Sequence, residues 1–475
     1  MMNDQPDIIW IYCDELRTDA LGCYGNARID PCTPNLDRLA KSGVRFANNF
    51  CNAPVCVASR CSTLSGLYPE ETGVYNNEGA WPNFRLPRPL KTFPHVFGQN
   101  GYLTASFGKT HVPAEMRPGA NPDNEIFQVN DGTGGDMKFW EALGEEAVRM
   151  IRSPYGGMHG GVYPDSEPYP PNAVVDNALQ WMDAADTPYL CRISILQPHT
   201  PVLPPARYVR LLEDQDPGLP EPLPETLSAF EKRVAEVYDV ASMAPGLLRA
   251  ARLHYYAQVA WIDDQVGRVL DFLDRTGRLE RTIVVFGSDH GNPIGDTGAF
   301  EKLTYTPTVH RVPLLFSWPG TLPTGKVRDD ICDSLDLGRT LLSLSGIETP
   351  DPFRGRDLFS DPSPYTVYAT IGFGQSFSKM APNGGRGEWF GGRGWPRRSC
   401  IRTDRYRLDK NVLINGKKPA PEDEDVFLAD WQTDPNEFTN LARNPHHADI
   451  VGKLSALLDR HTEGSVEVDP ECLKR

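Results

Sequence analysis

The chain has 475 residues, of which 40% are hydrophobic, and a formal net charge of −15 at pH 7. This length is enough for one large domain, or for a large domain and a smaller one, with a sizeable core. The acidic balance argues against a nucleic-acid-binding protein, which normally presents a basic face. An anionic substrate would therefore need positive charge supplied locally at its binding site.

The sequence predicts a cytoplasmic protein without a membrane partner. It contains no run of about 18 apolar residues, and residues 1–7 lack the basic start and apolar run of a signal peptide. Ten cysteines are spread from Cys13 to Cys472 without C-x-x-C spacing. We expect most of them to be free thiols in a reducing compartment.

The predicted elements alternate between strand and helix. The apolar run Asp7–Cys13 is typical of a strand buried on both faces. Thr33 and Pro34 then open a helix over 36–40, with Gly43 beyond its end. The remaining elements are a helix over 172–185, a strand over 189–195, a helix over 246–275 and strands over 282–286 and 314–316. This alternation predicts an α/β layer fold with a largely parallel sheet.

Composition shifts near Asp361–Pro364, and a strand-rich tail follows at 365–371 and 399–408. We therefore predict a main domain over 1–360 and a smaller C-terminal subdomain over 361–475. Two stretches, 201–224 and 383–398, are predicted to be long loops. Aromatic rings and arginines in the second loop suit stacking on a substrate ring or a contact between subunits.

Acidic and imidazole side chains follow two of the predicted strands. Asp14 comes directly after the first strand, and Asp289 and His290 follow the strand at 282–286. Ligands bind beyond the carboxyl ends of strands in open α/β sheets, so these three side chains are candidate ligands of one divalent cation. The alternative is that an Asp after a strand caps a helix or forms a turn.

The segment that begins at Cys56 contains Cys56-Val57-Ala58-Ser59-Arg60. It resembles the signature of the sulfatase family, Cys-x-Pro-x-Arg, in which dedicated machinery oxidises the cysteine to formylglycine. The alternative for Cys56 is a small buried hydrophobic residue. Cys51, Cys56 and Cys61 recur every five residues, which fits neither a zinc site nor one helix face.

Further segments extend the resemblance over almost the whole chain. Each is similar to a sulfatase motif, and they occur in the family's order: 101–111, ending in Gly-Lys-Thr-His; 197–201, Gln-Pro-His-Thr-Pro; 288–291, Ser-Asp-His-Gly; Lys302 with 311–314, Arg-Val-Pro-Leu; and 434–441, Asp-Pro-Asn-Glu-Phe-Thr-Asn-Leu. The resemblance implies an alkaline-phosphatase-like fold, in which helices sandwich a large, mixed, mostly parallel sheet. It also implies that the C-terminal subdomain is α+β.

The resemblance further implies a mechanism. Hydrated formylglycine at position 56 would be a metal ligand and the nucleophile that attacks a sulfate monoester. Arg60 and Lys109 would hold this group and neutralise the metal's surroundings, and His111 would be the base that regenerates the aldehyde. A structural Arg60 that pairs with a carboxylate and a structural His111 are the alternatives.

Substrate-binding roles follow in the same way. The resemblance implies that His199 and Lys302 bind the sulfuryl oxygens and assist the leaving group, and that Asn77 contacts substrate, with Asn76 as its competitor. A structural His199 and a solvated Lys302 are the alternatives.

Three positions depart from the common pattern. Ala58 stands where the signature has Pro, Glu15 where many members have a second Asp ligand, and His290 where the calcium-binding branch has Asn. The Asp-His pair is similar to the choline sulfatase and phosphonate monoester hydrolase branch. Because imidazole suits transition metals, Mn²⁺ joins Ca²⁺ as a candidate.

Two other functions stay open from the sequence. One is a phosphonate monoester or phosphodiester hydrolase on the same scaffold, although Lys109-Thr110-His111 favours the sulfatase. The other is a non-catalytic, metal-binding relative whose Cys56 is never oxidised. The expected partners are a small anionic ester, the formylglycine-generating machinery and further copies of the chain in a homo-oligomer.

Overall fold

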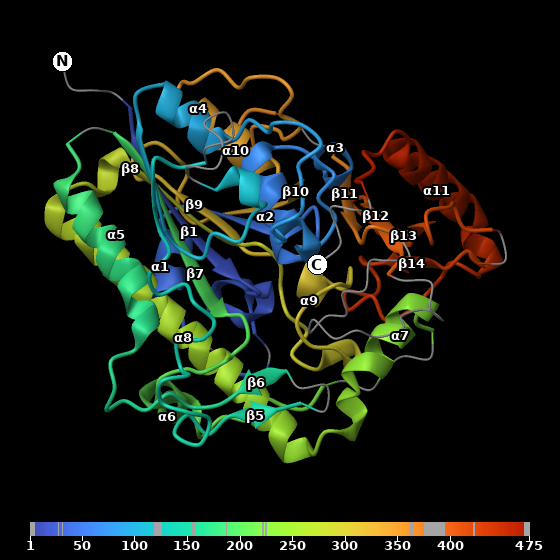
Figure 1. Cartoon of the computed structure of the whole chain (residues 1–475), viewed down its shortest axis with the longest axis horizontal. Coiled ribbons are helices and arrows are strands. Elements are labelled where there is room, and N and C mark those ends of the chain that lie inside the picture. The colour runs from blue at the N-terminus through green and yellow to red at the C-terminus, as the bar shows by residue number, and fades with distance from the viewer. Residues whose placement is uncertain are drawn as a thin grey trace.

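The computed structural model describes residues 5–469 except 27, 31, 118–125, 154–156, 187, 221–222, 224–225, 362–364, 375–394 and 421–422. Within these residues an eight-stranded sheet crosses the centre of the molecule in the order β10-β2-β9-β8-β1-β7-β3-β4 (Figure 1). β9 runs antiparallel to both its neighbours, and the other neighbouring pairs are parallel. The predicted mixed, mostly parallel sheet is confirmed. Its strands are β1 (Asp7–Asp14), β2 (Val44–Phe50), β3 (Leu103–Gly108), β4 (Val129–Asp131), β7 (Tyr189–Pro198), β8 (Thr282–Ser288), β9 (Leu314–Ser317) and β10 (Lys326–Asp333).

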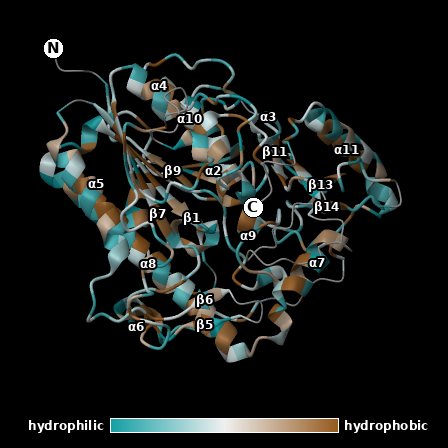
Figure 2. Ribbon diagram, in the orientation of Figure 1, coloured by the Kyte–Doolittle hydropathy of each residue, from teal (hydrophilic) through white to brown (hydrophobic). Residues whose placement is uncertain are grey.

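Helices cover both faces of this sheet, and the alternation of side chains along β1 shows why. Ile8, Trp10 and Tyr12 enter one apolar core, whereas Ile9, Ile11 and Cys13 enter the other. The first core is closed by α2 (Cys56–Ser65), α4 (Phe93–Gln99) and α10 (Asp336–Leu344). The second is closed by α1 (Pro34–Lys41), α5 (Ala173–Ala184) and α8 (Pro245–Thr276). Hydrophobic residues accordingly gather on the central strands and on the inward faces of the helices (Figure 2).

A second, antiparallel sheet lies beside the main one, and α11 (Ala448–Thr462) covers it (Figure 1). Leu454 and Leu458 of α11 pack against Ile401, Leu408 and Leu428 of this sheet. This arrangement is the expected smaller α+β unit. The boundary at 360/361 stays a prediction. The four strands are β11 (Val367–Ile371), β12 (Arg397–Arg402), β13 (Tyr406–Leu413) and β14 (Val426–Asp430).

Shorter elements complete the fold. They are α3 (Pro69–Thr72), α6 (Ala206–Leu212), α7 (Ala229–Tyr238), α9 (Pro307–His310), and the two-stranded sheet of β5 (Ile151–Arg152) and β6 (Met158–Gly160).

The structure differs from the sequence predictions in three local features. The predicted loop 201–224 contains α6, because Tyr208 and Leu212, one helical turn apart, are buried against α8. The Thr33 hydroxyl accepts a hydrogen bond from Gly22 N at 2.9 Å and does not cap α1. The strand-rich run 399–408 is divided between β12 and β13.

Two other predictions meet the structure in part. Most of the loop 383–398 lies outside the described residues, but Trp395 is described and is fully buried against Phe230. Nine of the ten cysteines are described, and all nine are free thiols. None of the described helices is long and apolar enough to cross a membrane.

Candidate active site

The ends of two neighbouring strands and the start of one helix meet at a single buried point. β1 and β8 pair in parallel up to Cys13 and Ser288, which places Asp14 beside the Asp289–His290 pair. Cys56 is the first residue of α2, and its Sγ lies 3.5 Å from Asp14 Oδ1 and 3.2 Å from His290 Nε2. All four side chains are fully buried. The structure thus brings together the residues that the sequence predicts as metal ligands.

Lys302 reaches the same point from a loop after β8. Its ammonium lies 2.5 Å from Glu15 Oε1, 3.1 Å from His199 Nε2 and 3.2 Å from Cys56 Sγ. An ammonium has three donors and no acceptor, so these three acceptors satisfy it and fix its position. His199 Nδ1 lies 2.5 Å from Thr200 O. This geometry makes Nδ1 the protonated nitrogen of His199 and leaves Nε2 to accept from Lys302.

Arg60 lies one helical turn after Cys56 and projects from the same face of α2. Its Nη2 donates to Asp14 Oδ2 and its Nε to Asp289 Oδ2, both at 2.8 Å. Lys109 Nζ lies 2.6 Å from the same Asp14 oxygen. The guanidinium and the ammonium therefore offset the charge of two carboxylates that would otherwise repel each other in the interior.

The electrostatics of the cluster favour an ionised residue at position 56. Burial disfavours a Cys56 thiolate, but the cations Lys302, Lys109 and His290 hold the pKa of this thiol well below its ordinary value. Burial likewise disfavours a charged His290, yet Asp289 and Cys56 raise its pKa to about 9. A metal ion bound here would displace protons from these groups, because metal ligands bind in their deprotonated forms.

His111 and Asn77 are at the edge of the site. His111 hydrogen-bonds with the Cys56 side chain, and burial lowers the pKa of its imidazole to about 4. Asn77 Oδ1 accepts a hydrogen bond of 3.0 Å from Val57 N and so satisfies a free donor at the start of α2. The neighbouring Asn76 side chain accepts from Asn77 N at 2.8 Å.

Two sets of side chains have the spacing of metal ligands. One set contains Asp14, Cys56, Asp289 and His290, and in the other Glu15 and His199 join Asp14 and Cys56; the ligand atoms of each set lie within 4.8 Å of one another. The first set offers two carboxylates and an imidazole, which suit a divalent cation of intermediate hardness. In the second set Glu15 is already paired with Lys302. Asp14 and Asp289 of the first set are likewise paired with Arg60, so ion pairing does not distinguish the two sets, and the residues predicted from the sequence are those of the first set.

Sequence reasoning did not assign roles to Glu15 and Asn292. Glu15 has a positive φ of 63°, accepts from Lys302, and also accepts from Asn292 Nδ2 at 2.9 Å. The available signals for Glu15 were its place next to Asp14 and its occupation of the position where many members of the family have a second Asp ligand. Nothing in the pattern around Asn292 indicates its contact.

Comparison with known proteins settles the family. The model of the sulfatase family matches residues 6–347. The chain belongs to the sulfatase family. This sulfatase is therefore classed with enzymes that hydrolyse sulfuric esters, as its sequence resemblance implied.

Similar proteins support this assignment. The ulvan-active sulfatase of Formosa agariphila is 30% identical, with 96% of this chain and 81% of that protein aligned. The arylsulfatase of Clostridium perfringens is 26% identical, with 98% and 95% aligned. A phosphonate monoester hydrolase from Silicibacter pomeroyi superposes with a TM-score of 0.76 at 21% identity, covering 98% of this sulfatase and 96% of that chain, and thus shares its fold.

Proposed function

We propose that this sulfatase hydrolyses sulfate monoesters with the side chain of residue 56 as its nucleophile, after Cys56 has been oxidised to formylglycine. The observation that carries the proposal is the position of Cys56. It begins a fully buried helix and points at Asp14, His290 and Lys302, with each contact at 3.5 Å or less. A structural cysteine would instead be expected among apolar groups, with its pKa raised.

A divalent cation fits the site and would involve Asp14, Asp289, His290 and residue 56. When bound, it would favour the deprotonated nucleophile and stabilise negative charge on the substrate. His290 is oriented for this role because its Nδ1 lies 2.9 Å from Gly291 O, which leaves Nε2 facing the site. We propose Ca²⁺ or Mn²⁺, and the imidazole ligand favours Mn²⁺.

The remaining residues divide into two groups. Arg60 and Lys109 contact Asp14 rather than open space, so we assign them to holding the carboxylates in place and balancing their charge. Lys302 contacts Cys56 Sγ and His199 directly. We assign Lys302 and His199 to the sulfuryl oxygens and to the leaving group, because Lys302 can transfer one hydrogen bond from Cys56 to an incoming anion.

Two further roles complete the assignment. His111 contacts residue 56 and holds a neutral imidazole at physiological pH, which is the form that a general base needs. Asn77 already caps α2 through its carbonyl oxygen, so only its amide nitrogen is assigned to substrate. We propose a small soluble sulfate ester as substrate, a homo-oligomeric assembly and a catalytic domain ending near residue 360.

Turnover of an aryl sulfate by protein produced with maturation machinery tests the function. Replacing Cys56 by alanine is expected to remove nearly all turnover while the circular dichroism spectrum stays unchanged. Cys61→Ala is the matched control and is expected to stay active, because Cys61 is a buried residue in the middle of the same helix whose Sγ contacts Met116. Full activity of Cys56→Ala would contradict the proposed nucleophile.

A phosphodiester or phosphonate monoester hydrolase is the second candidate, since such an enzyme shares the fold. Catalytic efficiencies on matched aryl esters separate the two. We expect the sulfate ester to be the best substrate, because selectivity arises where charge develops in the transition state. A preference for the phosphodiester would instead assign the chain to the second candidate.

A further inference from the structure

A cavity separate from the proposed catalytic site has the character of an anion-binding site. Its volume is about 340 Å³, and none of the predicted catalytic or metal-binding residues lines it. Small-molecule sites typically span roughly 300–1,000 Å³, so the cavity is large enough for an anion with an organic part. Its walls come from the segments that follow β1 (residues 17–28) and β8 (residues 296–311), from α8 and from the segment 435–438.

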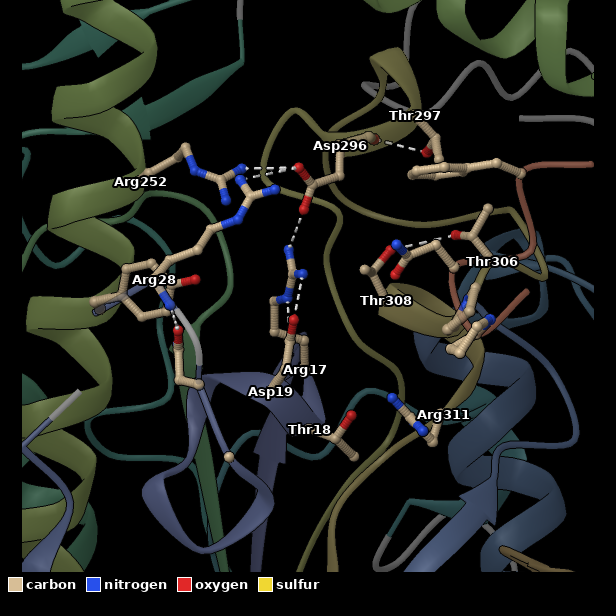
Figure 3. A pocket seen from close by; sticks show the side chains of 17 residues that line it. Arg17, Thr18, Asp19, Arg28, Arg252, Asp296, Thr297, Thr306, Thr308 and Arg311 are labelled. Atoms are coloured by element: carbon tan, nitrogen blue, oxygen red, sulfur yellow. Dashed lines mark hydrogen bonds and ion pairs between the residues drawn. The ribbon is translucent and has the colours of Figure 1, made fainter. Parts of the chain in front are cut away.

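Positive charge predominates on these walls. Four arginines face two aspartates, Asp19 and Asp296. Arg17 pairs with both aspartates, and Arg252 pairs with Asp296 at 3.1 Å (Figure 3). The lining therefore carries two positive charges in excess, although the chain as a whole carries −15. Such local concentration of positive charge attracts anions.

Arg311 is the arginine of this lining that forms no direct ion pair with a described residue, although Asp19 and Glu437 lie near enough to favour its charge. Its guanidinium makes no hydrogen bond or ion pair with any described residue, and its Nε is buried without a partner. In Figure 3 it lies on the wall opposite Arg28 and Arg252. Burial lowers the pKa of Arg311, and Asp19 offsets this effect only in part. Arg311 is half-buried and its Nε is left without an acceptor, so a bound anion would supply the missing hydrogen bond and counter-charge.

Hydroxyl groups lie on the same wall as Arg311. Thr306 and Thr308 line the cavity, and their Oγ1 atoms are 3.3 Å apart. Thr306 Oγ1 is also 2.9 Å from that of Thr304. A hydroxyl can donate one hydrogen bond and accept others. The hydroxyl groups of these three threonines can therefore reorient so that one of them donates to a ligand beside Arg311.

We propose that this cavity binds a small oxyanion, meaning a carboxylate, sulfate or phosphate group, between Arg311 and the hydroxyls of Thr306 and Thr308. The planar guanidinium would hold two oxygens of the group at once. Arg17 and Arg252 are paired with aspartates, and they add positive charge around the bound anion. The site is independent of the proposed catalysis, since it contains no residue assigned to turnover.

Phosphate binding measured by isothermal titration calorimetry tests the proposal. The protein carries Lys302→Ala, which weakens anion binding beside Cys56, and ionic strength is held constant with chloride. Adding Arg311→Gln is expected to weaken phosphate binding by about tenfold or more, because hydrogen bonds to charged groups are lost. Arg354→Gln removes a surface arginine elsewhere and is expected to change nothing. Equal phosphate affinity with and without Arg311 would overturn the proposal.

Two further measurements keep the test decisive if Arg311→Gln does not fold. Thr308→Val, which keeps the volume, is expected to weaken phosphate binding several-fold, and an unchanged affinity counts against the site. Crystals soaked in selenate are expected to show an anomalous peak within hydrogen-bonding distance of Arg311. A peak beside Lys302 alone, or water in the cavity, would overturn the proposal. Repeating the titration with sulfate and acetate distinguishes the three oxyanion groups.

Discussion

Replacing Arg60 by methionine tests how much of the stability of this protein depends on charge balance at the site. The guanidinium and both carboxylates it contacts are fully buried. Its removal leaves Asp14 still paired with Lys109 at 2.6 Å, whereas His290, at 3.8 Å, becomes the nearest charged partner of Asp289, whose Oδ1 still accepts from the backbone N–H groups of Glu15 and His290. One carboxylate is thus left nearly unpaired, so we expect a loss of about 3–5 kcal/mol in the free energy of unfolding.

Urea unfolding of chelator-treated protein, followed by tryptophan fluorescence, measures this loss. Arg354→Met is the matched control, because Arg354 pairs with Glu71 at the surface and is 51% exposed. A surface pair contributes about 0–1 kcal/mol. Adding Asp289→Asn to Arg60→Met removes the unpaired charge and is expected to restore part of the stability. If Arg60→Met costs no more than Arg354→Met, or if the double variant is the less stable, the reasoning about the buried cluster is wrong.

Three other predictions concern the metal, the leaving group and pH. Asp289→Asn is expected to weaken Mn²⁺ and Ca²⁺ binding at least about tenfold by calorimetry, and unchanged affinity would refute its role as a ligand. Lys302→Ala is expected to slow hydrolysis of aryl sulfates with poor leaving groups more than that of activated ones; equal losses would contradict its assignment to the leaving group. Glu70 is buried, yet His461, whose Nε2 lies 3.5 Å from Glu70 Oε2, lowers the pKa of this carboxyl. A lowered carboxyl pKa stabilises the fold above the ordinary value, and this stabilisation disappears as pH falls through the folded-state value. Wild type should therefore lose more stability than Glu70→Gln between about pH 5 and pH 3 in urea titrations, and parallel curves would refute this.

The inner strands β1, β7, β8 and β9 could be predicted from the sequence because they are buried along their whole length, whereas the partly exposed β2, β4 and β10 were not predicted. The apolar runs Asp7–Cys13 and 282–286 predict strands without any knowledge of the segments they pack against. Their carboxyl ends in turn predict that Asp14 lies near Asp289. α6 was missed because its short apolar stripe lies among prolines, and its burial depends on contact with α8. Long-range packing of this kind leaves little trace in local sequence.

The residues of the candidate active site were also predictable from local sequence only in part. Cys56 and Arg60 share a helix face, so their spacing alone predicts that they point together. Lys302 and His199 lie on segments without periodicity, and only the family resemblance selected them. The contact between Glu15 and Lys302 accompanies a positive φ at Glu15, and no residue pattern in the sequence predicts this backbone conformation. The catalytic roles of all these residues stay predictions.

The measurement that bears most directly on the central claim is tandem mass spectrometry of the tryptic peptide ending at Arg60, from protein made with active maturation machinery. This peptide begins at Phe46 and contains both Cys51 and Cys56, so it carries its own control. Conversion of cysteine to formylglycine removes one sulfur and two hydrogens and adds one oxygen. We predict this change at Cys56, with Cys51 still a thiol. An intact thiol at Cys56 in protein that turns over sulfate esters would contradict the proposed nucleophile.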